Sequence, residues 1–252
     1  MRIIISPAKK MRVDAEYLPC QDLPRFLGEA ETLLQRLRQL DPGALQALWK
    51  CNDVLARENI ERLGQMDLYQ RLTPAILAYD GIQYRYLAPN VLEAGELEYL
   101  QAHLRILSGF YGLLRPLDGV TPYRLEMQAK LSVGEARDLY AFWGNKLGAA
   151  LGEETDQVLN LASREYSRAV LPYLPKHVAW ADCVFGQVVG GKVVEKGTLC
   201  KMARGSMVRW LAQSQAKDLE AAKGFCQLGY AYDPNRSTEE TYVFIKGGEK
   251  AC

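Results

Sequence analysis

Four short apolar runs in this chain each end in a small polar residue that precedes a turn. In open α/β sheets, ligands bind beyond the carboxyl ends of the strands, so parallel strands would gather these polar residues at one edge. The pattern therefore predicts an α/β fold with a pocket at that edge. The four junctions are Ile5-Ser6, Tyr79-Asp80, Leu107-Ser108 and Ala162-Ser163.

The rest of the apolar pattern alternates between helical and extended spacing. It predicts one compact domain over residues 1–252, α/β with mixed α+β character, in which helices surround a mixed sheet. Residues 22–68 form a helical subdomain in this interpretation, with helices around 23–40, 44–49 and 54–63. We expect further helices around 97–104, 139–151 and 200–214, strands at 3–5, 75–79, 105–109, 158–162, 229–232 and 241–245, and a hairpin at 188–194.

The charge balance excludes a protein that binds nucleic acid through bulk positive charge. Lys and Arg number 31 against 30 Asp and Glu, a formal net charge of +1, so any contact with DNA requires a local basic patch. No segment matches a signal peptide or approaches the ~20 apolar residues of a membrane-spanning helix. We therefore expect a cytoplasmic, monomeric protein without a membrane partner.

The six cysteines are scattered and contain no C-x-x-C pair, which excludes a zinc ribbon or a dithiol redox motif. In a reducing compartment such cysteines are free thiols, and Cys252, at the end of the sequence, is expected to be exposed.

A second group of polar residues surrounds the expected pocket. The glycine- and aromatic-rich segment 109–118 is followed by residues 122–127. If this second segment is a strand, Arg124 and Glu126 lie on one face of it. Arg124 can then bind an anion while Glu126 orients the Arg124 side chain, or the two residues form a structural ion pair. Ser6 and Ser163 can equally be N-cap residues that start helices. The pocket candidates are Ser6, Asp80, Ser108, Tyr111, Asp118, Tyr123, Glu126, Ser163, Glu165 and Tyr166.

Basic residues are concentrated on the helix expected near residue 200. Five basic and no acidic residues lie between Lys196 and Lys217. A basic, half-buried helix edge suits phosphate, although a solvated helix face gives the same pattern. Gly205 on that edge lets a neighbour approach the backbone. The candidates for binding DNA or another anion are Lys9, Arg115, Arg124, Arg164, Lys201, Arg204 and Arg209, together with Gly43 of the helical subdomain.

Gly43 belongs to the sequence Asp41-Pro42-Gly43, which separates two expected helices. In a helix-hairpin-helix element, such a glycine turn exposes helix N-terminal amides to a DNA phosphate. Arg36, Arg38 and Lys50 can add positive charge. The alternative is a simple helix start, with aspartate as the N-cap and proline in the first turn.

Searches for catalytic and metal motifs are negative. Neither His103 nor His177 has companions at ligand spacing, and no nucleophile-elbow, phosphate-loop or dinucleotide-binding fingerprint is present. We therefore expect no metal and no cofactor, assign no catalytic residue and expect no enzymatic activity.

Several segments together resemble the YaaA peroxide stress resistance family. They run in order along the chain: residues 6–9, 107–118, 122–127, 142–143, 160–166 and 201–205. The resemblance implies a cytoplasmic protein that protects against hydrogen peroxide, limits free iron and so limits oxidative damage to DNA. It further implies a compact fold with a helix-hairpin-helix element and a basic cleft that binds duplex or distorted DNA. One departure is Met202, where the family often has a second lysine before Ala203-Arg204-Gly205.

Two functions therefore remain. The resemblance favours a DNA-binding stress protein with little sequence preference, whereas the Ser, Asp, Tyr, Arg and Glu candidates describe a pocket for an enzyme acting on a small anionic substrate. An open basic groove would favour DNA, and a closed pocket would favour the enzyme.

Overall fold

The central strand β1 (Arg2–Ile5) organises the main sheet of the protein, which is described here by a computed structural model of residues 1–14 and 17–247. The isoleucines of β1 are completely buried, and β1 pairs in parallel with β5 (Leu104–Ser108) on one side and β8 (Gln157–Leu161) on the other. β-Branched side chains suit such a strand, which is covered on both faces.

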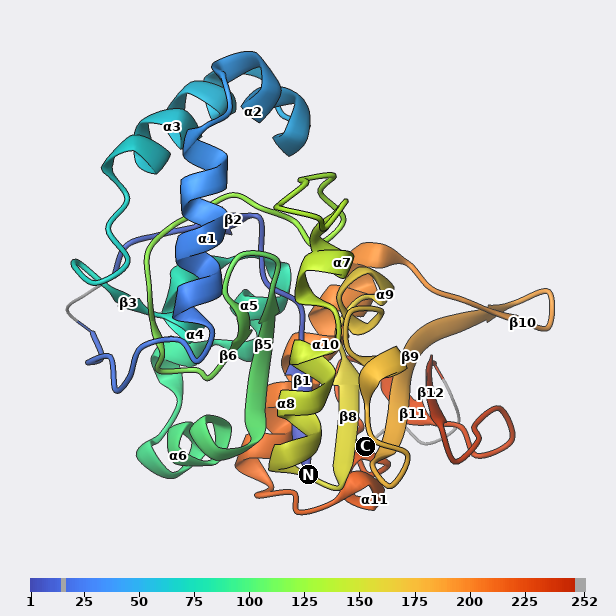
Figure 1. Cartoon of the computed structure of the whole chain (residues 1–252). Coiled ribbons are helices and arrows are strands. Elements are labelled where there is room, and N and C mark those ends of the chain that lie inside the picture. Colours follow the sequence, from blue (N-terminus) through green and yellow to red (C-terminus); the bar gives the residue numbers. More distant parts are fainter. Residues whose placement is uncertain (15–16, 248–252) are drawn as a thin grey trace.

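The sheet has the strand order β11-β12-β9-β8-β1-β5-β6, and β10 pairs with β9 (Figure 1). The other strands of this sheet are β6 (Gly112–Leu114), β9 (Ala179–Val189), β10 (Lys192–Val194), β11 (Tyr230–Tyr232) and β12 (Thr241–Lys246). The five inner strands are parallel, whereas β6, β10 and β11 pair antiparallel with their neighbours. The expected α/β fold with a mixed sheet is therefore confirmed.

The helical block consists of α1 (Leu27–Arg38), α2 (Pro42–Trp49) and α3 (Asp53–Gln65). It lies beyond the carboxyl ends of the central strands, at the top of Figure 1. Four residues of α1, namely Ala30, Leu33, Leu34 and Leu37, are buried at helical spacing, so the amphipathic pattern correctly indicated this helix.

Helices cover both faces of the sheet, with α8 (Lys146–Glu154) in front and α10 (Gly197–Gln213) behind in the view of Figure 1. The other helices and turns are α4 (Ala75–Ala78), α5 (Ile82–Leu87), η1 (Pro89–Val91), α6 (Ala94–His103), α7 (Leu139–Trp143), α9 (Arg164–Ser167), η2 (Leu171–Tyr173) and α11 (Leu219–Ala222). Two small sheets pair β2 (Lys10–Met11) with β4 (Tyr79–Asp80) and β3 (Thr73–Pro74) with β7 (Gly119–Val120).

Two local predictions are wrong, and a third segment lacks the strand that was considered for it. Residues 75–78 form the short helix α4 rather than a strand, because a wholly buried apolar run does not distinguish the two. The helix expected over 139–151 is interrupted at Gly144, whose φ of +48° ends α7. Residues 122–127 contain no strand.

The cysteines also depart from expectation in one place. Cys20, Cys51, Cys183 and Cys200 are free, as predicted, but Cys226 is disulfide-bonded. The expectation for Cys252 concerns a residue outside the described part of the chain. Within that part, none of the helices has the length and apolar character needed to cross a bilayer.

Candidate functional site

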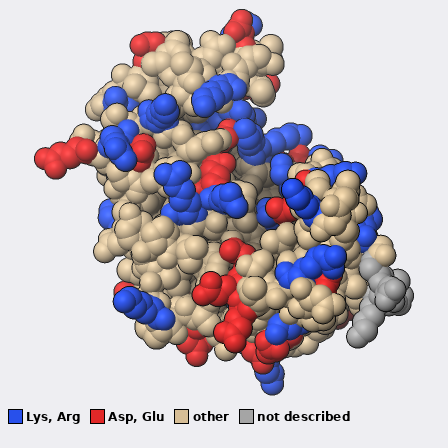
Figure 2. All heavy atoms as spheres, turned by 90° about the vertical axis from the view of Figure 1, so that its right-hand side faces the viewer, with Lys and Arg blue, Asp and Glu red and all other residues tan. Residues whose placement is uncertain are grey.

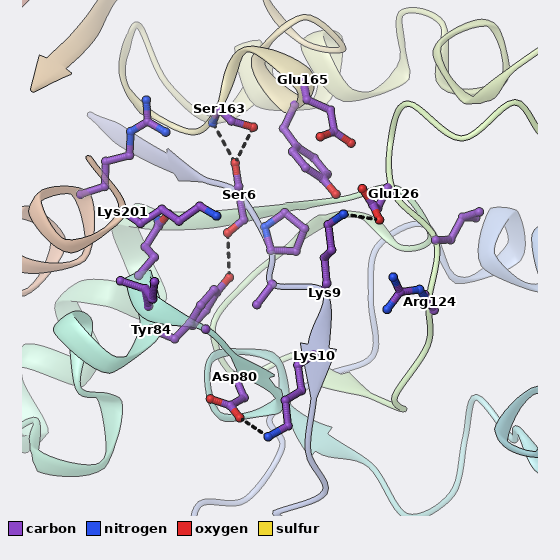
Figure 3. Close-up of a pocket in the computed structure, with 18 of the residues that line it drawn as sticks. Ser6, Lys9, Lys10, Asp80, Tyr84, Arg124, Glu126, Ser163, Glu165 and Lys201 are labelled. Atoms are coloured by element: carbon purple, nitrogen blue, oxygen red, sulfur yellow. Dashed lines mark hydrogen bonds and ion pairs between the residues drawn. The ribbon is translucent and has the colours of Figure 1, made fainter. Parts of the chain in front are cut away.

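A pocket with a volume of about 420 Å³ lies at the carboxyl ends of β1 and β8 (Figure 3). Its walls come from the segment after β1, from α5, from the irregular segment 123–126, from α9 and from α10. The register explains why the strand ends meet, since Ile5 is paired with Leu161. Of the predicted site residues, the pocket brings together Ser6, Lys9, Asp80, Tyr123, Arg124, Glu126, Ser163, Glu165, Tyr166, Lys201 and Arg204.

The ends of β1 and β8 are joined by hydrogen bonds between two serines. The Ser163 amide donates to Ser6 Oγ over 2.8 Å, and the Ser6 hydroxyl donates to Ser163 Oγ over 3.2 Å. Ser163 is the N-cap residue of α9, but its side chain makes no capping hydrogen bond. Its position therefore reflects the junction with Ser6 rather than helix capping alone.

Two lysine–carboxylate pairs flank the pocket. Lys9 Nζ lies 2.8 Å from Glu126 Oε1, and Lys10 Nζ lies 2.9 Å from Asp80 Oδ2. The hydrogen bond from Lys10 lowers the pKa of the Asp80 carboxyl. Glu126 is thus paired with Lys9, not with Arg124 as the sequence suggested.

The other cations of the pocket have no acidic partner among the described residues. Arg124, Lys201 and Arg204 form no ion pair there, and the Nε atoms of both arginines are buried without a hydrogen-bond partner. Arg124 makes only a long 3.4 Å hydrogen bond to the Trp49 carbonyl of α2. Figure 2 shows lysines and arginines gathered around a hollow below the helical block. The pocket therefore contains positive charges that no acidic side chain of the described residues neutralises.

A half-buried carboxyl, that of Glu165, adds an acceptor to the same pocket. Glu165 Oε1 accepts the backbone amide of Gln128 over 3.2 Å. Burial raises the pKa of Glu165, and the nearby Glu126 carboxylate raises it further. Such a carboxyl can accept hydrogen bonds from a ligand or, once protonated, donate one.

Tyrosines form much of the pocket wall. The Tyr84 hydroxyl donates to the Ser6 carbonyl over 3.0 Å, and the Tyr123 hydroxyl lies 2.7 Å from Ser108 Oγ. Burial raises the pKa of Tyr123 to about 12, so its hydroxyl stays protonated near neutral pH.

Ser108 lies fully buried behind Tyr123, where its Oγ accepts the amides of residues 110 and 111. Tyr111 is a core residue whose hydroxyl bonds to Thr121 Oγ1. Ser108 and Tyr111 therefore support the pocket without lining it.

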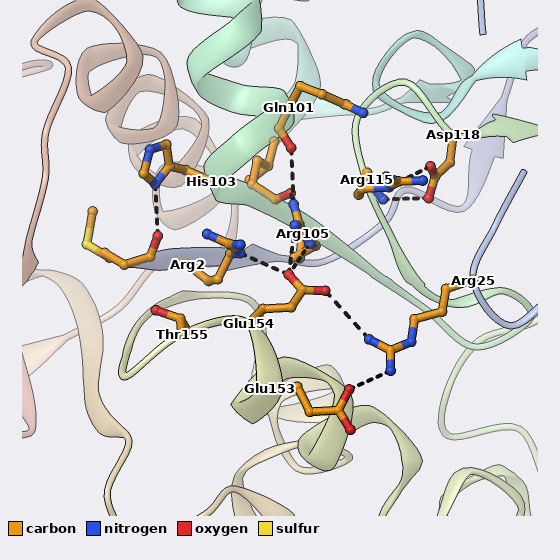
Figure 4. A network of polar contacts seen from close by, with 12 residues as sticks. Arg2, Arg25, Gln101, His103, Arg105, Arg115, Asp118, Glu153, Glu154 and Thr155 are labelled. Carbon is orange, nitrogen blue, oxygen red and sulfur yellow. Dashed lines mark hydrogen bonds and ion pairs between the residues drawn. The ribbon is translucent and has the colours of Figure 1, made fainter. Parts of the chain in front are cut away.

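Arg115 and Asp118 belong to a different polar cluster (Figure 4). Arg115 Nε lies 3.1 Å from Asp118 Oδ1, and Arg115 also pairs with Asp22. Burial raises the pKa of Asp118 to about 6. The prediction that these two residues reach the pocket is wrong. Arg115 instead pairs with Asp118 in the same β6–β7 turn and with Asp22 in the segment before α1.

The same figure shows a network that joins the amino ends of the central strands. Glu154 Oε2 accepts hydrogen bonds from Arg2 Nε over 2.9 Å and from Arg105 Nε over 2.7 Å. Arg105 is 5% exposed, so this ion pair is a buried structural contact. Its position at the opposite end of β1 from Ser6 separates it from the pocket.

The remaining basic candidates also lie outside the pocket lining. Arg164 is exposed on α9, and Arg209 is half-buried on α10. Gly43 is exposed in the first turn of α2, where Asp41 Oδ1 accepts the Ala44 amide over 2.9 Å. A phosphate at this turn would compete with the Asp41 carboxylate, so the geometry fits the simple helix-start interpretation.

The sequence interpretation missed the contribution of α5. Gln83 and Tyr84 on this helix line the pocket, and the Gln83 Nε2 atom is buried without a partner among the described residues. The signal was Gly205 on α10. A Cβ at this position would overlap the Gln83 carbonyl and lie 3.0 Å from the Leu87 amide nitrogen. This glycine lets α5 and α10 pack closely.

A comparison with known proteins agrees with the motifs. The family model described as peroxide stress protein YaaA matches residues 1–236. A UPF0246 protein of Lachnoclostridium phytofermentans is 53% identical over 247 residues, which cover 98% of this chain and 97% of the relative. UPF0246 proteins of Lactiplantibacillus plantarum and Pediococcus pentosaceus are 49% and 48% identical, and each match covers at least 97% of both chains. On the strength of both comparisons, the chain belongs to the YaaA family of peroxide stress proteins.

Proposed function

We propose that this protein acts in the cytoplasm during peroxide stress by binding DNA phosphates at the basic mouth of the pocket, which consists of Arg124, Lys201 and Arg204. The observation that carries the proposal is the buried Arg204 Nε, which has no partner among the described residues. A buried donor without a partner costs roughly 1–3 kcal/mol. A phosphate oxygen that accepts this hydrogen bond removes the cost and adds a charge-assisted interaction.

The distribution of charge supports a polyanion rather than a single contact. Lys201 and Arg124 lie on opposite sides of the pocket, and neither has an acidic partner within the described residues (Figure 3). Phosphate contacts position DNA without reading its sequence. The family resemblance points to the same ligand, although the helix-hairpin-helix geometry at Gly43 does not contribute to the proposal.

The enzyme alternative is favoured by one observation. The pocket is a cavity of about 420 Å³, which is the size of a small-molecule site. The Ser6 and Ser163 hydroxyls line it together with the half-buried Glu165. In that interpretation, Arg204 and Lys201 bind the anionic group of a small substrate.

Iron is not part of the proposed activity. In residues 1–14 and 17–247, no three His, Cys, Asp or Glu side chains are grouped so that they can hold a metal ion. A lower level of free iron would then follow indirectly, and the absence of a metal site stays a prediction.

A salt titration tests the proposed function. If Arg124 neutralises one phosphate and Lys201 and Arg204 together neutralise a second, the logarithm of the binding constant should fall with the logarithm of salt concentration with a slope of about −2. Fluorescence anisotropy of a labelled duplex at a series of salt concentrations measures the slope. An affinity that does not change with salt would contradict the proposal.

A further inference from the structure

The corner between α5 and α10 concentrates hydrogen-bond donors without partners. Gln83 Nε2 and Arg204 Nε are both buried and unpaired among the described residues, and Gln83 is only 7% exposed. Lys201 lies one helical turn before Arg204 and points toward Ser6 (Figure 3). Two cations and a neutral amide at one corner match the several oxygens of one phosphate group.

The opposite side of the pocket carries carboxyl groups, which accept hydrogen bonds. Glu126 and Glu165 lie across the pocket from Lys201 (Figure 3). Lys9 neutralises Glu126, whereas Glu165 accepts only backbone amides near Met127 and Gln128 among the described residues. A carboxylate there accepts hydrogen bonds from amino or hydroxyl groups and repels a second phosphate.

The space between the two sides suits one flat, partly apolar group. Tyr84 and Tyr166 are almost fully buried in the wall, and Pro7 and Ala8 also line the pocket. A cavity of about 420 Å³ holds a molecule of nucleotide size and excludes a duplex. Aromatic side chains and apolar surfaces are also what hold an unpaired base in nucleic-acid-binding sites.

We infer that the pocket binds a single unpaired nucleotide, with its 5′-phosphate at Gln83, Lys201 and Arg204 and an amino group of its base at Glu165. The inference rests on the proposed DNA binding and extends it, because the pocket then takes one nucleotide from the strand that the basic mouth holds. Extruding a nucleotide costs a few kcal/mol in a paired duplex and least where the base is already unpaired.

Calorimetric titration with deoxyadenosine monophosphate tests the inference directly. The intact protein should bind this nucleotide about tenfold more tightly than inorganic phosphate or deoxyadenosine, since each of these fills only one side of the pocket. The Gln83→Leu and Glu165→Gln variants should each lose about tenfold in nucleotide affinity. The exposed Glu135→Gln serves as the matched control and should bind like the unchanged protein.

The outcomes separate this inference from the proposed function. If labelled duplex binds with salt dependence but the nucleotide binds no better than inorganic phosphate, the inference is overturned and the proposed function remains. If neither binds, both are overturned. Should Gln83→Leu unfold, Glu165→Gln still decides, because an unchanged nucleotide affinity in a folded Glu165→Gln protein contradicts the assigned orientation.

Discussion

Replacing Arg204 with alanine is expected to weaken DNA binding by about 5- to 150-fold, equivalent to roughly 1–3 kcal/mol. The Arg204 side chain lines the pocket and has no acidic partner among the described residues, so its loss removes a ligand contact without freeing a buried carboxylate. Anisotropy titrations of a labelled duplex with the intact and substituted proteins measure the change.

Arg209→Ala is the matched control for this experiment. Arg209 carries the same charge on the same helix, but it does not line the pocket. We expect it to change the affinity less than threefold, within the range of a distant surface charge. If Arg204→Ala lowers the melting temperature and leaves the affinity of the folded protein unchanged, Arg204 is structural and does not belong to the site.

Replacing Gly205 with alanine is expected to lower the free energy of unfolding by about 3 kcal/mol. The new Cβ would overlap the Gln83 carbonyl and lie 2.9 Å from the Gln83 carbonyl carbon, and both atoms belong to the backbone of α5. Relief requires α5 and α10 to move apart, which also separates Gln83 from Arg204. Urea denaturation should therefore show lower stability, and DNA titration should show weaker binding by the folded protein.

Gly197→Ala supplies the comparison, because Gly197 begins the same helix and a Cβ there meets no atom within 4 Å among the described residues. Alanine is the better helix former, so this variant should be as stable as the unchanged protein or slightly more stable. Equal stability of the two variants would show that the close approach of α5 and α10 tolerates a methyl group.

The central strands and the meeting of their ends could be predicted, because short apolar runs followed by a polar residue are typical of buried parallel strands. Ile3, Ile4 and Ile5 are β-branched and buried on both faces of the sheet, and Ser6 and Ser163 follow paired strands. The hairpin near residue 190 could also be predicted, because a Gly-Gly pair favours a tight turn. Gly190 and Gly191 both have positive φ values in the structure.

The features that could not be predicted depend on tertiary packing. Residues 75–78 are apolar on every side, so nothing in their spacing distinguishes a buried helix from a strand. Arg115 lies in a motif next to pocket residues, yet its charge is matched by Asp22 and Asp118, far apart from each other in sequence. The sequence around Gln83 does not mark it as a site residue. Its Nε2 atom is buried without a hydrogen-bond partner only because α5 packs on α10.

The most direct test of phosphate binding at the basic mouth is lysine protection measured by acetylation and mass spectrometry. Lys201 and Lys192 are both exposed, but only Lys201 lines the pocket. With saturating duplex DNA, we expect acetylation of Lys201 to slow severalfold, since a bound phosphate blocks its amine, while Lys192 on the β9–β10 hairpin reacts at its original rate. If Lys201 reacts equally fast with and without bound DNA, the pocket mouth is not where DNA binds.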